Sequence, residues 1–120
     1  MNYRAAKIFI LNKLKSELPS GLSYHGLHHT KDVLRTATAL CVAEGISGTL
    51  AKLVKTAALL HDSGFVTNQH SGHEIQGCII AKNVLPDFGY TIDEIEEICN
   101  MIMATKIPQS PKSLVEQILC

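Results

Sequence analysis

The stretch LAKLVKTAALLHDSGF, residues 50–65, decides the fold of this 120-residue chain. Its apolar residues recur at intervals of three and four, which is the spacing of one helical face. These residues are Leu50, Leu53, Val54, Ala57 and Leu60. We predict a helix over 48–62 that buries this face, ends before Gly64 and carries the pair His61-Asp62 at its end.

The same periodicity continues on both sides of this stretch, and no alternation typical of strands occurs. Further helices are predicted over 3–18, 29–44 and about 72–85. A fifth helix is predicted to begin at the capping box of Thr91 and Glu94, and a sixth at Ser110-Pro111. In the helix over 29–44, the inward stripe is His29, Val33, Ala37, Leu40 and Cys41. We expect an all-α bundle of five to six helices and a single domain over 1–120.

Composition excludes several classes of protein. Eleven basic residues balance eleven acidic ones, so net charge does not indicate binding to a nucleic acid polymer. No apolar run approaches the roughly 18 residues that a membrane span needs. The opening NYRAAKIFIL lacks the features of a signal peptide, and we expect a cytoplasmic location.

The four cysteines lie far apart and form no C-x-x-C motif. They are Cys41, Cys78, Cys99 and Cys120, and each stands among aliphatic residues. We expect reduced, buried thiols rather than disulfides or a zinc knuckle.

Three histidines continue the apolar faces of their helices. His29 and His61 stand on the inward stripes of 29–44 and 48–62, and His73 has the same phase in the next helix. A single buried histidine is most often a hydrogen-bonded core residue. Three of them, with Asp62 and Glu74 adjacent to two, indicate a buried divalent cation, because a metal compensates the cost of a buried carboxylate.

The segments YHGLHHTKDV (24–33) and LAKLVKTAALLHDSGF (50–65) resemble the HD-domain superfamily of metal-dependent phosphohydrolases. The resemblance covers roughly residues 20 to 120 and points to a bacterial branch. It implies that His29, His61 and Asp62 bind the metal. Mn, Fe, Mg, Ni and Zn all suit this mixture of imidazole and carboxylate ligands.

The chain departs from the superfamily pattern near its end. The superfamily has a last Asp ligand on a late helix, and no Asp follows Asp93 here. The bundle is therefore expected to lack its C-terminal part, and this chain to be a weak or inactive form of its parent. We also expect apolar surface where further helices would pack, which would favour a homo-oligomer.

The resemblance assigns further roles. His25 stands where related phosphodiesterases donate a proton to the leaving oxygen, although an exposed loop histidine fits it equally. His73 and Glu74 would bind a second metal or orient the attacking water; helix N-terminal capping is the other reading. Lys106 would contact a phosphate group, or be merely solvated. His28 is predicted to point outward or to lie behind a metal ligand and support it, about 100° from His29 on a helix.

Two functions remain open on the sequence. The first is hydrolysis of a nucleotide or another small phosphate ester by a metal-activated water. The second is a non-catalytic metal-binding or signalling module with the same fold. An Asp encoded soon after Cys120 would favour the enzyme.

Overall fold

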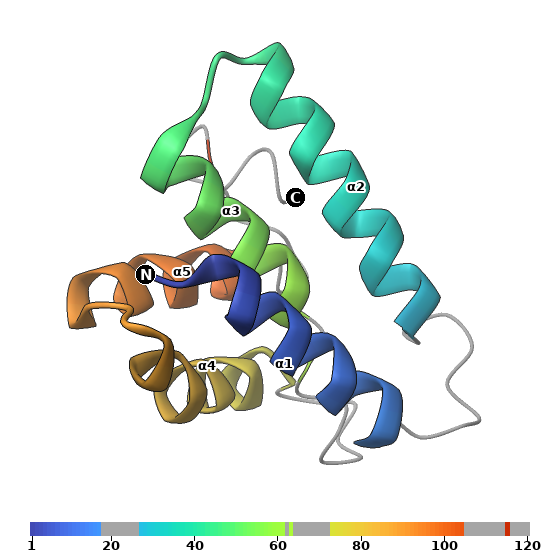
Figure 1. Ribbon diagram of the computed structural model, residues 1–120, viewed down its shortest axis with the longest axis vertical. Coiled ribbons are helices and arrows are strands. Elements are labelled where there is room, and N and C mark those ends of the chain that lie inside the picture. Colours follow the sequence, from blue (N-terminus) through green and yellow to red (C-terminus); the bar gives the residue numbers. More distant parts are fainter. Residues whose placement is uncertain (18–26, 62, 64–72, 105–114, 116–120) are drawn as a thin grey trace.

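The computed structural model describes residues 1–17, 27–61, 63, 73–104 and 115, and this part contains five α-helices and no strand (Figure 1). The helices are α1 (Tyr3–Glu17), α2 (Leu27–Ala43), α3 (Gly48–Leu60), α4 (His73–Val84) and α5 (Ile92–Ala104). A short 3₁₀ helix, η2 (Leu85–Phe88), links α4 to α5. The predicted all-helical fold is confirmed. The predicted sixth helix lies outside the described residues, except that residue 115 is helical and buried.

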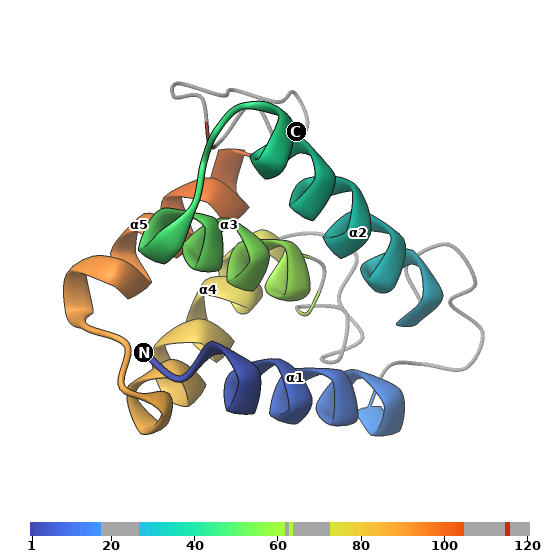
Figure 2. The same cartoon turned by 45° about the horizontal axis from the view of Figure 1, so that its top comes forward.

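Helix α3 is the centre of the fold. It contacts each of the other four α-helices, and Figures 1 and 2 show it between α1, α2 and α5. A helix that is covered on several sides needs apolar residues around most of its circumference. The buried residues of α3 accordingly extend beyond one stripe: Ala51, Leu53, Val54, Thr56, Ala57, Ala58, Leu59 and Leu60.

Two residues that we predicted to be in the core are exposed. Leu40 of α2 and Leu50 of α3 each have 38% of their surface exposed. Both lie close to the connection between α2 and α3, which Figure 1 shows at the edge of the molecule away from α1 and α4. The position of a residue around its own helix does not reveal whether a neighbouring helix extends far enough to cover it.

The helix ends follow local signals. The backbone N–H of Thr91 donates to the Glu94 carboxylate at 2.8 Å, and the N–H of Glu94 donates to the Thr91 hydroxyl at 3.1 Å. This confirms the predicted capping box of α5. Helix α4 ends at Val84, just before Pro86, and Gly89 closes η2 with a φ of 80°.

The predicted limits of the second and third helices need correction. Helix α2 begins at Leu27, two residues earlier than predicted. Helix α3 ends at Leu60, so His61 is its C-cap residue rather than part of its last turn. None of the described helices is long and apolar enough to cross a bilayer.

A buried hydrogen bond joins α3 to the start of α5. The Thr56 hydroxyl donates to the Lys52 carbonyl at 2.7 Å, and its oxygen lies 2.7 Å from the Tyr90 hydroxyl. Because the single Thr56 proton is used on Lys52, Tyr90 must donate to Thr56. Burial raises the pKa of the Tyr90 phenol, which therefore keeps the proton that it donates.

Removing the two ends of this bond should have unequal effects. Tyr90→Phe deletes the donor but leaves Thr56 bonded to Lys52, so we expect a loss of about 0.5–1.5 kcal/mol in unfolding free energy. Thr56→Val leaves the buried Tyr90 hydroxyl without its acceptor and should cost more, about 1–3 kcal/mol. Urea denaturation of both variants measures the difference; equal losses would contradict the assigned donor direction.

Candidate metal centre

The connection between α2 and α3 brings His29 and His61 together. Only four residues separate the two helices, and such a short connection makes them antiparallel neighbours. The start of α2 therefore lies beside the end of α3. His29 and His61 are each 16 positions from Gly45 in this turn, so they stand at similar heights along the hairpin.

The two imidazole rings lie side by side. Their centroids are 5.7 Å apart, with an angle of 58° between the ring planes. Two imidazoles that bind one cation at about 2.1 Å place their centroids roughly 4.5 to 5.5 Å apart at bond angles of about 90–120°. The spacing of His29 and His61 is close to the upper end of this range and is compatible with a shared cation. The side chain of His61 is buried and that of His29 is half-buried.

A backbone carbonyl fixes the orientation of the His61 ring. Nδ1 of His61 lies 2.8 Å from the carbonyl oxygen of Ala58, in the last turn of α3. A backbone carbonyl oxygen can only accept, so Nδ1 must carry the proton. In the neutral ring, Nε2 then carries the lone pair. Metal-binding histidines in proteins are typically oriented by a bond of this kind.

The third predicted ligand, Asp62, lies outside the described residues. Within the described part of the chain, no group of three or more His, Cys, Asp or Glu side chains is arranged to hold a metal ion. Of the three predicted ligands, the structure describes His29 and His61. Their spacing and the tautomer of His61 are compatible with a divalent cation.

Helix α4 packs closely against the end of α3. A Cβ added to Gly77 would lie 3.1 Å from the carbonyl oxygen of Leu60 and 3.5 Å from the Ser63 hydroxyl oxygen. Ser63, which is itself buried, donates to the same Leu60 carbonyl at 2.7 Å. Neither Gly77 nor Ser63 was among the predicted site residues. A glycine inside an otherwise regular helix was the available signal for such a close approach.

This packing places Glu74 near the end of α3. Glu74 is three residues before Gly77 and thus on the same face of α4. Only 6% of its surface is exposed. A carboxylate in the first turn of a helix is also favoured by the helix dipole, so capping and a site role are compatible here.

The remaining candidates fall into three groups. His25 and Lys106 lie outside the described residues, and of His73 the structure describes only its place as the first residue of α4. His28 points outward as predicted, with 87% of its side chain exposed and Nε2 at 3.4 Å from the Asp32 carboxylate. The predicted roles of His25, His73 and Lys106 stay predictions.

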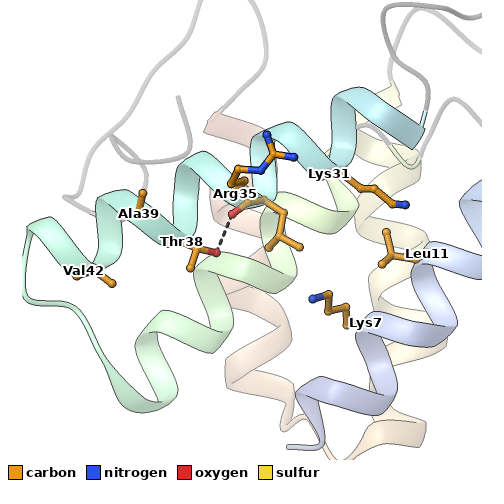
Figure 3. A pocket seen from close by; sticks show the side chains of 8 residues that line it. Lys7, Leu11, Lys31, Arg35, Thr38, Ala39 and Val42 are labelled. Carbon is orange, nitrogen blue, oxygen red and sulfur yellow. Dashed lines mark hydrogen bonds between the residues drawn. The ribbon is translucent and has the colours of Figure 1, made fainter.

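A separate groove runs between α1 and α2 (Figure 3). It has a volume of about 600 Å³ and an apolar floor that includes Leu11 and Leu34. Lys7, Lys31 and Arg35 stand along it, and none of its lining residues is a predicted site residue. The groove is thus distinct from the histidine pair, although it adds positive charge along the helix that carries His29.

Comparison with known proteins identifies the family. A family model described as the HD domain matches residues 26–120. An uncharacterized protein of Clostridium beijerinckii is 33% identical over 88 residues, which are 72% of this chain and 55% of the relative. The chain thus matches about half the length of this curated relative. No solved structure matches. The chain belongs to the HD domain family, whose members are typically metal-dependent phosphohydrolases.

Proposed function

We propose that this protein hydrolyses a small phosphate ester with a divalent cation held by His29, His61 and Asp62. The observation that carries the proposal is the pairing of His29 with His61 at 5.7 Å, with Nδ1 of His61 bonded to Ala58. Asp62 follows His61 directly in the chain. The membership in the HD domain family supports the reaction class.

The metal and the side chains of the protein would have different roles in the reaction. A divalent cation in this place supplies Lewis acidity to water and to phosphoryl oxygens. The Ala58 carbonyl holds the His61 ring in the tautomer that ligation needs. Glu74 would orient the attacking water, His73 would assist it, and His25 would give a proton to the leaving oxygen. Lys106 would contact the phosphate group.

The proposed substrate class rests on the basic residues of the groove and on the net charge of the chain. Lys7 and Lys31, in the groove that is distinct from the histidine pair, would favour an anionic ligand over a neutral one, whereas Arg35 there is already paired with the Asp32 carboxylate at 3.0 Å. The whole chain has a formal net charge of zero, so this preference is local rather than a general attraction to polyanions. A nucleotide or another small phosphate ester therefore fits better than a nucleic acid polymer.

Metal-dependent turnover tests the proposal. Purified protein would be stripped with a chelator and assayed with Mn²⁺, Fe²⁺, Mg²⁺, Ni²⁺ or Zn²⁺ on a panel of p-nitrophenyl esters, nucleotides and cyclic nucleotides. We expect hydrolysis with at least one metal, weak in this chain as the sequence predicts, and its loss after chelation, because the water has no other activator in this proposal. His28→Ala should retain both metal content and activity, since this exposed side chain lies outside the proposed site.

The panel also separates the two functions that the sequence left open. Bound metal without turnover of any ester would favour a non-catalytic metal-binding module. Turnover that persists in the stripped protein would contradict the proposed mechanism. Elemental analysis of the same samples identifies the metal.

A further inference from the structure

Two cysteine thiols meet at the interface between α4 and α5. The Sγ of Cys78 lies 3.6 Å from the backbone oxygen of Cys99, and the Sγ of Cys99 lies 3.8 Å from the backbone oxygen of Cys78. Each thiol thus donates its single proton to the backbone oxygen of the other cysteine. Both cysteines are free and buried. This reciprocal contact distinguishes them from Cys41, which is also buried but has no cysteine beside it among the described residues.

One of the two thiols borders a recess. Cys99 lines a cavity of about 540 Å³ together with Lys82 of α4 and Glu96 and Asn100 of α5. Cys78 is not among its lining residues. A small oxidant that enters the recess therefore meets Cys99 first.

We propose that Cys78 and Cys99 are a reversible redox pair in which a peroxide oxidises Cys99 and Cys78 then closes a disulfide between α4 and α5. The geometry supplies the two requirements of such a pair: a nucleophile that a small oxidant can reach, and a resolving thiol already in contact with it. The proposal is independent of the metal centre and of the hydrolytic function.

The electrostatics agree with the order of the two steps. The adjacent Cys78 side chain lowers the pKa of Cys99, against the opposing effect of burial, and the positive charge of Lys82 lowers the pKa of both thiols. The same contact with Cys99, together with burial, raises the pKa of Cys78. Because the thiolate is the nucleophile, Cys99 attacks and Cys78 resolves.

The chemistry balances with one peroxide for each disulfide. The Cys99 thiolate attacks one oxygen of hydrogen peroxide, the O–O bond breaks, and Cys99 becomes a sulfenic acid while the other oxygen leaves as hydroxide and takes a proton to become water. The Cys78 sulfur then attacks the Cys99 sulfur, an S–S bond forms, and the S–O bond breaks to release a second water. The two sulfurs lose two electrons, which reduce the peroxide. A dithiol reductant restores both thiols.

The experiment uses the full chain with Cys41→Ser and Cys120→Ser, so that only this pair can react. Hydrogen peroxide should lower the intact mass by about 2 Da, the mass of two hydrogens, and dithiothreitol should restore it. Peptide mapping should show Cys78 joined to Cys99 within one chain. Cys78→Ser should instead accumulate a sulfenic acid at Cys99 that dimedone traps, while Cys99→Ser should lose the reaction.

Several results would overturn the proposal. They are an unreactive Cys99 in the folded protein, a disulfide only between chains, or reaction of Cys78 in the Cys99→Ser variant at the rate of the parent. Mapping of the unsubstituted protein after peroxide treatment gives the same decision without relying on any variant to fold. In the unsubstituted protein, the proposal requires the Cys78–Cys99 disulfide to form before Cys41 is oxidised.

Discussion

Replacing His61 by alanine should abolish metal retention and with it the proposed hydrolysis. His61 is paired with His29 at 5.7 Å and is oriented by the Ala58 carbonyl. Losing a partner that merely orients a metal ligand typically costs roughly 10–100-fold in affinity or activity, so losing the ligand itself should cost at least that much. Elemental analysis and the rate on the best ester of the panel measure the two losses.

The control for this variant is His28→Ala. It removes an imidazole from the same hairpin, but from a side chain that is 87% exposed and lies beside Asp32 rather than beside the other ring. Circular dichroism must show that both variants remain helical. A His61→Ala protein that is folded and retains the parent's metal content would refute the assigned site.

The histidine pair shows how much of the site is predictable from sequence. The inward phase of His61 follows from its spacing to Val54 and Ala57, and its burial is confirmed. The meeting of His29 with His61 follows from antiparallel helices and from their equal distance to Gly45. The bond from His61 to Ala58 was not predictable, because it depends on the rotamer of the His61 side chain, which helical phase does not specify.

The errors in the predicted core have a different cause. Leu40 and Leu50 have the correct helical phase, yet both are exposed because no described helix covers them near the α2–α3 connection. Periodicity reports the direction of a side chain around its own helix. It does not report how far the neighbouring helices extend. The contact of Cys78 with Cys99 likewise depends on the register of α4 against α5, which neither helix specifies alone.

Replacing Gly77 by valine should be the most damaging single substitution on α4. The first added carbon would already lie 3.1 Å from the Leu60 carbonyl oxygen and 3.6 Å from Cγ2 of Ile102, and valine adds two methyl groups beyond it. The nearest of these neighbours is backbone at the end of a buried helix and cannot turn away. Overpacking of this kind typically costs about 1–3 kcal/mol, and thermal or urea unfolding measures it.

Asn83→Val is the matched control for Gly77→Val. It places the same β-branched residue in α4 at an exposed position, where the helix propensities of asparagine and valine are similar. The control should therefore stay close to the parent in stability. Because Leu60 directly precedes His61, the displacement at Gly77 should also weaken metal binding while the control retains it. Equal stability of the two variants would show that α4 does not pack against the end of α3 as described.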